Sequence, residues 1–353
     1  MSKSLYYICA TLLLALTSAL TGCDVHQVPE PAEKVKIHVR LNFETDMALW
    51  EHVYDGTSIT EDGVVDTYDN ARETGNIRYI IKAYPVDDKG TVSDTHSDEF
   101  VFTKNVNDGY DFGVTLDLLP GKYNIMVWSD IMRYGSDTPN YNADNFGAIV
   151  LSVPHDGNNE YFDAFRGIGE ALLVSDIYLR EPDTLDIAMQ RPLAKYEIIS
   201  NDLKQFIDKE IEYLTKEAMS RGETVPSRVN TDNYTVVVKY SVYMQSEYSM
   251  FADIPIDSAE GVLFESKLNV LSDTEASLGF DYIFVNNQNT GVTLQVGLYD
   301  DKNRQLALSN SINVPLRRSH HTVLRGSFLM QNASGGITIN PDFEEEDYNI
   351  EIK

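Results

Sequence analysis

The sequence predicts a mainly β protein with two β-sandwich domains and one amphipathic helix in the second domain. Eight segments spread along the 353 residues alternate apolar and polar side chains with a period of two, which is typical of half-buried strands. Only residues 203–218 repeat their apolar side chains at helical spacing. The chain is also long enough to bury the cores of two ordinary domains.

The strand pattern is clearest at residues 35–43, where five apolar side chains alternate with Lys, His, Arg and Asn. The other seven segments are 77–84, 99–104, 114–118, 123–128, 234–244, 278–285 and 292–298. Leu119-Pro120-Gly121-Lys122 separates two of them and contains the residues of a tight turn. We therefore expect residues 114–128 to form a hairpin.

The predicted helix has signals at both of its ends. Asp202 precedes the apolar stripe and Gln205 follows three residues later, which is the spacing of a capping box. Gly222 suits the left-handed residue that ends a helix. We expect the apolar stripe to cover a sheet rather than to bind a cofactor. The stripe consists of Leu203, Phe206, Ile207, Ile211, Leu214 and Ala218.

Two long polar stretches, 44–76 and 129–159, lack sustained periodicity and are predicted to be loops. Loops of this length often carry function, so we expect them to form any binding surface of the first domain. Charge and pattern change near 180–191. The sequence thus predicts an N-terminal domain over residues 34–188 and a C-terminal domain over residues 189–353.

The first 22 residues have the composition of a signal peptide. Lys3 is followed by an apolar run, 8–16, which is too short to span a bilayer, and then by small residues. Leu20-Thr21-Gly22-Cys23 resembles the lipobox that bacterial lipoprotein signal peptidase cleaves. We expect residues 1–22 to be removed and Cys23 to carry fatty acyl chains such as palmitate. The alternative is an ordinary secretory signal in which Cys23 is incidental.

Residues 23–33 are predicted to be a tether. They contain Pro29 and Pro31 and few side chains that could pack in a core. At a polyproline-like rise, ten residues extend about 30 Å, which would lift the first domain above the lipid headgroups.

The acidic composition limits the partners of the chain. The sequence has 28 basic and 55 acidic residues and a net charge of −27, and loss of Lys3 makes it −28. Such a charge repels nucleic acid and anionic lipid surfaces. Because Cys9 lies in the signal peptide, the mature chain holds one cysteine and cannot form an internal disulfide.

The sequence contains no nucleophile elbow, phosphate loop, paired cysteines or zinc-protease motif. His320 and His321 are neighbours on a predicted strand and would point to opposite faces, so they cannot chelate one ion together. The acidic stretches 137–144 and 342–347 do not have the ligand spacing of a calcium loop. We therefore expect no catalytic residue, no metal ion and no cofactor.

Aromatic residues in the predicted first-domain loops suggest a surface on which sugar rings stack, although packing explains them equally well. They are Tyr134, Tyr141, Phe146, Tyr161 and Phe162. Trp128 falls on the opposite strand face from Tyr123, Ile125 and Val127. We expect Trp128 to lie in the core of the first domain or at its rim, covered by a loop or by the second sheet.

Several segments resemble the fimbrillin-like lipoproteins of Bacteroidales, a group that includes anchor and tip subunits of type V pili. With the lipobox, the similar segments are 117–130, 163–167, 190–196, 314–326 and 335–343. The resemblance implies two transthyretin-like β-sandwich domains, lipid on Cys23, an outer-membrane location and no enzymatic activity. It further implies contact with fimbrial subunits, in an anchor, accessory or adhesin-type role. A surface lipoprotein that binds glycans through first-domain loops is the alternative function.

Two features bear on how this family pattern applies here. Asp24-Val25-His26-Gln27 follows the cysteine, whereas surface-displayed relatives often carry Lys or an acidic pair there, so surface and periplasmic orientations both remain open. Asp183-Thr184-Leu185 and Asp257-Ser258-Ala259 resemble the O-glycosylation tripeptide of this phylum. Thr184 and Ser258 are therefore candidate glycosylation sites.

The segment 335–353 is predicted to contribute two strands to the second domain. Ile337 and Ile339 alternate with polar residues, as do Ile350 and Ile352, so each run has one apolar face. Such a segment either closes its own sandwich or is donated to a partner. We expect deletion of residues 336–353 to cause misfolding in the first case and loss of partner contacts in the second.

We expect the substitution Cys23→Ala to abolish lipid attachment, because no other residue near the cleavage site can form the thioether. Metabolic labelling with an alkyne fatty acid measures this directly. The mutant should lose its membrane anchor as well as its label. Undiminished labelling would show that Cys23 is not the lipid site.

Overall fold

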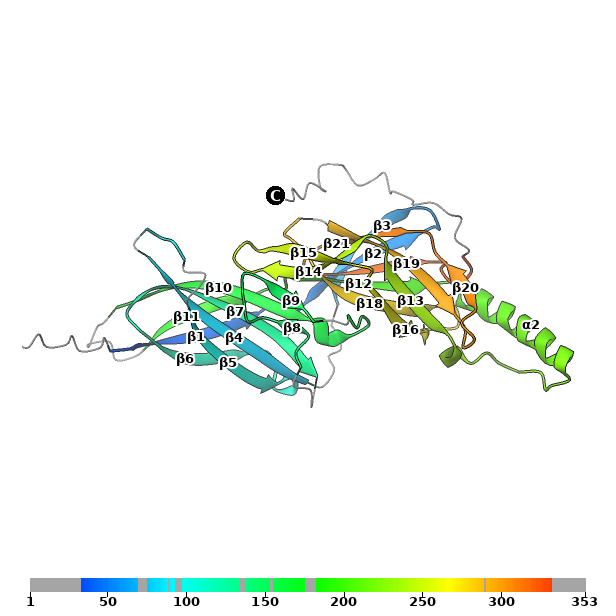
Figure 1. Ribbon diagram of the computed structural model, residues 1–353, viewed down its shortest axis with the longest axis horizontal. Coiled ribbons are helices and arrows are strands. Elements are labelled where there is room, and N and C mark those ends of the chain that lie inside the picture. The colour runs from blue at the N-terminus through cyan, green and yellow to red at the C-terminus, as the bar shows by residue number, and fades with distance from the viewer. Residues whose placement is uncertain are drawn as a thin grey trace, which may run out of the picture.

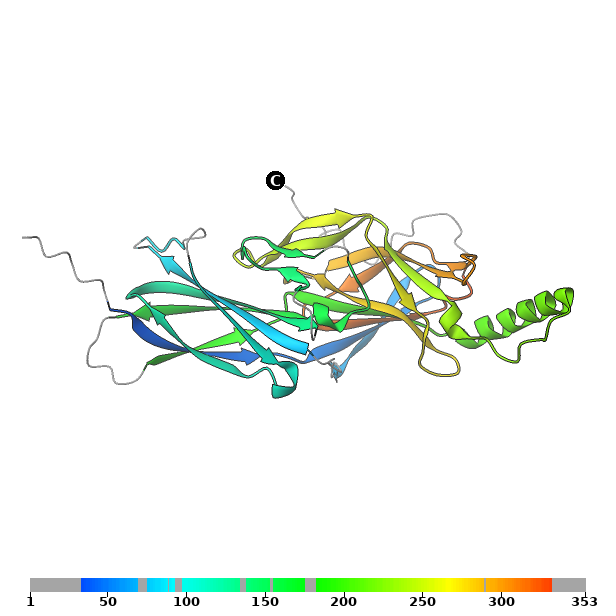
Figure 2. The same ribbon diagram turned by 60° about the horizontal axis from the view of Figure 1, so that its bottom comes forward.

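A computed structural model describes residues 33–68, 75–87, 89–92, 97–133, 138–152, 155–174, 182–288 and 290–331. Within these residues the protein is mainly β with one α-helix, as the sequence predicts. Two stacked groups of sheets follow one another along the longest axis of the molecule (Figures 1 and 2). The described chain begins at one end of that axis, and the helix projects from the other end.

The first sandwich consists of a three-stranded and a four-stranded sheet. The strand orders are β11-β1-β6 and β10-β7-β4-β5. Apolar side chains of both sheets, including Val39, Leu41, Ile81 and Val127, form the core between them. The strands are β1 (Val35–Phe43), β4 (Gly75–Val86), β5 (Asp98–Asn105), β6 (Phe112–Leu118), β7 (Gly121–Arg133), β10 (Ala164–Leu173) and β11 (Asp183–Met189).

The predicted hairpin at 114–128 is wrong. β6 pairs with β1, whereas β7 pairs with β4 and β10, so the two strands belong to opposite sheets of the sandwich. The Leu119–Lys122 connection therefore crosses from one sheet to the other, and the Tyr123 hydroxyl donates a 3.0 Å hydrogen bond to the Leu119 carbonyl at its base. Pro and Gly specify a tight connection but not which strands it pairs.

The second sandwich is built from a six-stranded sheet, β17-β18-β12-β22-β2-β3, and a five-stranded sheet, β16-β13-β19-β20 with β21 also on β19. A four-stranded sheet, β15-β14-β9-β8, flanks them. The strands before residue 189 are β2 (Met47–Tyr54), β3 (Ile59–Tyr68), β8 (Tyr141–Asn142) and β9 (Ile149–Leu151). Those after it are β12 (Leu193–Ser200), β13 (Thr235–Tyr240), β14 (Tyr243–Ser249), β15 (Ile254–Glu260), β16 (Leu263–Lys267), β17 (Asn269–Val270), β18 (Ala276–Phe284), β19 (Thr290–Tyr299), β20 (Gln305–Leu308), β21 (Ile312–Leu316) and β22 (His320–Gly326).

The prediction that 44–76 is a loop is wrong, because β2 and β3 lie within it. β2 runs parallel to β22 and is paired with it from Ala48–His320 to Tyr54–Gly326. β8 and β9 likewise lie in the predicted loop 129–159, and β9 pairs with β14. The domain boundary at 188/189 remains a prediction. Strands from both sides of this boundary pair with one another, β2 with β22 and β9 with β14.

The strands β4 and β7, at the centre of the four-stranded sheet of the first sandwich, are buried on both faces. Along β4, Tyr79 and Ile81 face the first core, whereas Ile80 and Tyr84 belong to the second. Trp128 of β7 also belongs to the second core and is fully buried there. Its ring contacts Tyr141 and Phe284, with centroids 5.3 and 6.5 Å away. The predicted burial of Trp128 is confirmed, but its cover comes from the second sandwich.

The helix α2 (Leu203–Arg221) ends as predicted, with Gly222 in the left-handed conformation at φ 70°. The predicted capping box is wrong, because the Asp202 side chain makes no cap hydrogen bond. Instead the Asp202 carboxylate accepts hydrogen bonds from the backbone N–H groups of Leu329 and Met330, at 3.2 and 3.0 Å. The carboxylate thus holds the chain that follows β22.

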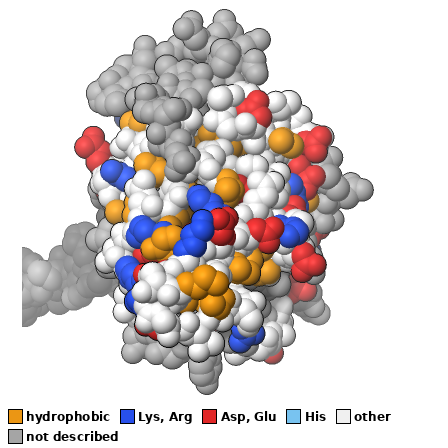
Figure 3. Space-filling model, turned by 90° about the vertical axis from the view of Figure 1, so that its right-hand side faces the viewer, with side chains coloured by type: hydrophobic (Ala, Val, Ile, Leu, Met, Phe, Trp, Pro, Cys, Tyr) orange, Lys and Arg blue, Asp and Glu red, His pale blue; other side chains and the backbone are white. Residues whose placement is uncertain are grey.

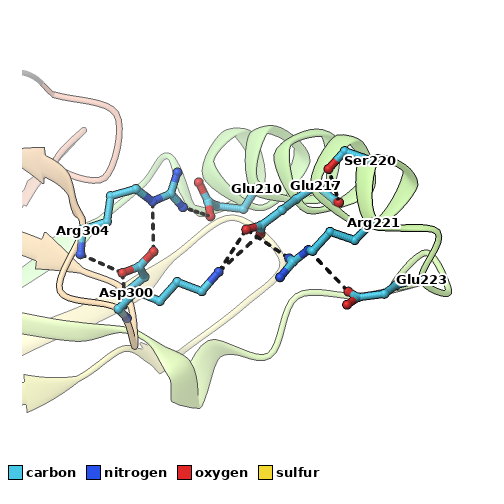
Figure 4. Close-up of polar contacts among 8 residues, drawn as sticks. Glu210, Glu217, Ser220, Arg221, Glu223, Asp300 and Arg304 are labelled. Atoms are coloured by element: carbon cyan, nitrogen blue, oxygen red, sulfur yellow. Dashed lines mark hydrogen bonds and ion pairs between the residues drawn. The ribbon is translucent and has the colours of Figure 1, made fainter.

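Ion pairs fix the direction of α2 relative to the sheet. Arg304 binds Glu210 of the helix at 3.2 Å and Asp300 of its own loop at 2.9 Å, and Lys302 binds Glu217 at 3.1 Å (Figure 4). Figure 3 views this end of the molecule, where basic and acidic side chains lie among apolar ones. Among the described helices none is long and apolar enough to cross a membrane.

Candidate functional site

The predicted modification sites have different outcomes in the structure. Cys23 lies outside the described residues, as does the C-terminal segment 335–353. Thr184 is exposed on β11, and Ser258 is exposed on β15. Both hydroxyls are therefore accessible, and glycosylation at either remains a prediction.

The two adjacent histidines have separate surroundings. His320 Nδ1 lies 2.8 Å from the Arg318 carbonyl oxygen, whereas His321 is buried with Nε2 3.4 Å from Glu197 Oε2. Burial lowers the pKa of His321, although the neighbouring Glu197 opposes this effect. Among the described residues no group of three or more His, Cys, Asp or Glu side chains is placed to hold a metal ion.

The idea that first-domain loop aromatics form a sugar platform is wrong for the described residues. Tyr141, Phe146, Tyr161 and Phe162 are all buried, and the Tyr141 hydroxyl donates a 2.7 Å hydrogen bond to the Phe162 carbonyl. Tyr141, Phe146 and Phe162 belong to the core of the second sandwich, whereas Tyr161 belongs to the core of the first. Tyr134 lies outside the described residues.

A buried ion pair joins the two sandwiches, and we call it the joint. Arg191 lies between β11 and β12 and binds Asp163 through two hydrogen bonds of 2.7 and 2.9 Å. Its remaining nitrogen donates to the carbonyls of Glu44 and Asp46, in the segment between β1 and β2. Arg191 therefore holds together two places where the chain passes from one sandwich to the other.

A second cluster of charge surrounds Asp253, in the turn between β14 and β15. Its carboxylate binds Arg166 of β10 and Arg318 of the β21–β22 turn, and accepts from Asn287. Arg166, Arg191 and Arg318 all come from segments that resemble the fimbrillin-like family. In the structure, these segments meet where the two sandwiches touch.

The described part of the chain contains a polar pocket of about 620 Å³ in the second sandwich, within the roughly 300–1,000 Å³ range of small-molecule sites. We call it the β16–β18 pocket. Its lining comes from six separate parts of the chain, so only the folded protein assembles it. The lining residues are Arg133, Asp156, Gly157, Asn158, Asn159, Glu197, Thr235, Glu265, Ser266, Lys267, Asn269, Ser277, Gly279 and Phe280.

The loop 155–159 forms one wall of this pocket and is fixed to β18. The Asn158 N–H donates a 2.7 Å hydrogen bond to the Phe280 carbonyl, and His155 pairs with the buried Asp281 at 2.5 Å. Gly157 permits this approach, because a Cβ there would lie 2.3 Å from the Phe264 ring. The wall is therefore held in position before any ligand binds.

A fixed carboxylate lies in the pocket lining. Glu197 accepts a 2.6 Å hydrogen bond from the Ser277 hydroxyl and lies beside His321. Burial alone would raise the pKa of Glu197, but the hydrogen bonds from His321 and Ser277 outweigh burial and lower it. Glu197 therefore stays ionised at neutral pH and serves as an acceptor.

The outer strand β15 offers a different kind of surface. β15 is the last strand of its sheet, so its outer backbone groups are unpaired within the described residues. Ile254 and Ile256 are 43% and 46% exposed on it, and Phe251 just before it is 38% exposed. An edge strand with exposed apolar side chains is a template for pairing with another chain.

The pocket lining contains two serines, Ser266 and Ser277, whose hydroxyls donate to the Leu278 carbonyl and to the Glu197 carboxylate. The sequence signals did not identify the pocket, since its residues are of ordinary types and are scattered between 133 and 280.

We expect Asp163→Asn to destabilise the protein by about 3–5 kcal/mol, because it leaves the Arg191 charge buried without its partner. Urea unfolding measures the loss. The control is Asp186→Asn, whose partner Arg40 is exposed, and it should leave the unfolding midpoint nearly unchanged. An Asp163→Leu/Arg191→Leu double variant should lose less than Asp163→Asn alone. Equal effects of Asp163→Asn and the control would contradict this account of the joint.

Comparison with solved structures finds chains of similar extent but low identity. A protein provisionally described as an adhesin from Bacteroides ovatus matches at a TM-score of 0.40 and 10% identity, over 84% of this chain and 92% of its own. A protein with the same description from Bacteroides thetaiotaomicron matches at 0.39 and 9%, over 81% of each chain. The fimbrial anchor protein Mfa2 from Porphyromonas gingivalis matches at 0.36 and 11%, over 78% and 80%.

No curated protein matches the sequence. One family model matches residues 31–353, which include all of the chain after the predicted signal peptide and tether. The chain belongs to the family of unknown function DUF6562.

Proposed function

We propose that this protein is a cell-envelope lipoprotein that acts by non-covalent contact with other proteins. Lipid on Cys23 would hold it at the outer membrane, and residues 23–33 would set its distance from the bilayer. The leading role is an anchor, accessory or adhesin-type subunit of a fimbria. The start of β1 and the helix α2 lie toward opposite ends of the long axis, so a tether before β1 would present the second sandwich away from the membrane (Figure 1).

The observation that carries the proposal is the unpaired edge of β15. Ile254 and Ile256 together expose apolar surface beside unpaired backbone groups. A strand from a partner can satisfy those groups and cover both isoleucines, which is the physical basis of strand addition. Pro255, Asp257 and the irregular pairing with β14 are features that restrict strand addition, so Ile254 and Ile256 mark the part of the edge that a partner would cover.

Glycosylation at Ser258 would regulate the same edge. Ser258 lies on β15, two residues after Ile256, and its side chain is exposed. A glycan there would stand beside the apolar edge and limit strand addition. The other candidate, Thr184, is on the edge strand β11 of the first sandwich and would shield a different sheet.

Glycan binding is the second candidate function, and the β16–β18 pocket is the observation that favours it. The predicted aromatic platform is buried, but residues 156–159 of the same long segment line the pocket. The first half of the chain would thus contribute polar groups, rather than rings, to a sugar site.

We expect the double substitution Ile254→Lys/Ile256→Lys to remove most partner crosslinks of the protein in intact cells. Two charges on the edge oppose burial against an incoming strand. Photo-crosslinking followed by mass spectrometry of the captured proteins is the measurement. The two side chains are about half exposed, so the fold should tolerate the change.

The matched control is Val101→Lys. Val101 is 54% exposed on β5, which is also an edge strand but belongs to the first sandwich. Crosslinks should persist in this control. Loss of crosslinks in both variants, or in neither, would count against β15 as the contact surface.

A further inference from the structure

We propose that the β16–β18 pocket binds a neutral oligosaccharide. The proposal deepens the second candidate function, because it names the ligand class and the residues that recognise it. It also moves the expected sugar site from the first-domain loop aromatics to a pocket in the second sandwich. The argument rests on the lining, the charge balance and the fixed geometry of this pocket.

Most residues that line the pocket are of polar types, although about half of the lining surface is apolar. Pockets for apolar ligands are lined by aliphatic and aromatic side chains, whereas here Phe280 is the one large apolar residue. Apart from Gly157 and Gly279, the other side chains offer amide, hydroxyl, carboxylate, ammonium and guanidinium groups. A sugar hydroxyl donates one hydrogen bond and accepts others, so it can pair with every one of these groups.

The charges of the lining nearly cancel. Arg133 and Lys267 are cationic, whereas Asp156, Glu197 and Glu265 are anionic. With one more carboxylate than cation, the pocket gives no net attraction to phosphate, sulfate or uronic acids. A neutral ligand meets acceptors and donors without a cost in like-charge repulsion.

The geometry of the pocket is fixed before binding. Gly279, at φ 138°, lies where the pairing of β12 with β18 shifts register between Ile198 and Ile199. Such bulges redirect side chains and are frequent beside binding sites. The Lys267 ammonium is held at 3.3 Å from the Asp232 carbonyl. The bulge, the Lys267 contact and the loop 155–159 hold the lining in position, so the protein loses less conformational entropy when a ligand binds.

Phe280 supplies the apolar contact that sugar recognition needs. Its side chain is half-buried, and the Lys195 ammonium lies 4.3 Å from the ring centre. The apolar face of a sugar ring can rest against such an aromatic side chain while its hydroxyls reach the surrounding polar groups. One ring with a polar surround fits a short oligosaccharide rather than an extended apolar ligand.

The test is a glycan array that carries both neutral and acidic glycans, probed with the chain from residue 24 onward. Titration calorimetry then measures the affinity of each glycan that binds on the array, for the wild type and for three variants. One has Glu265→Gln and Lys267→Gln, one has Phe280→Ala, and the control has Lys239→Gln and Glu260→Gln. The control residues are exposed on β13 and β15 and lie outside the lining.

We expect neutral glycans to bind, with affinity lowered about tenfold or more by both lining variants and unchanged in the control. Affinity should also be nearly independent of salt, since no net charge is paired. Because Phe280→Ala could disturb packing, its melting temperature is measured alongside. If that variant is unfolded, the affinity of the Glu265→Gln/Lys267→Gln variant alone tests the proposal, because both of its substituted residues are exposed.

Three outcomes would overturn the proposal. The wild type could bind no glycan, it could bind only acidic glycans, or the lining variants could bind as well as the wild type. Failure of the envelope role is a separate result, because it is measured by crosslinks that depend on β15. A protein that binds no glycan but keeps those crosslinks would refute the pocket and leave the contact function standing.

Discussion

A buried cation, Arg191, lies where the chain passes between the two sandwiches. Arg191 is fully buried and is paired with Asp163 and with two backbone carbonyls of the β1–β2 segment. Beside it, the Glu44 N–H donates to the Met189 carbonyl, so both passages of the chain lie together. A buried guanidinium is tolerated only with such complete pairing. The joint therefore fixes where each sandwich begins and how the strands on either side are directed.

Besides the joint, an apolar core that contains residues of both sandwiches holds them together. Strands β4 and β7 pack against the first core on one face and the second core on the other, and β2 pairs with β22, which is far away in the sequence. Interfaces between independent domains are usually smaller and more polar, which allows relative motion. Here the two sandwiches form one body, and that rigidity positions the loop 155–159 over β18 to form the pocket wall.

Much of the fold could be predicted from the sequence. Strands with one solvent-exposed face, such as β1, show a clear alternation of apolar and polar residues. Gly222 ends α2 as predicted. β2 and β3 were hidden because their pairing is interrupted by register shifts, which break the period of two. The alternation at 77–84 predicted a half-buried strand, whereas β4 is buried on both faces, as its successive apolar residues Tyr79, Ile80 and Ile81 would have indicated. The pocket could not be predicted, because it depends on where one loop is folded onto a distant strand.

Calorimetric unfolding of the chain from residue 24 onward tests most directly whether the two sandwiches are one body. We expect a single transition whose calorimetric and van't Hoff enthalpies agree. Asp163→Asn should lower that transition as a whole. Two separate transitions in the wild type, with only one of them moved by Asp163→Asn, would contradict the account.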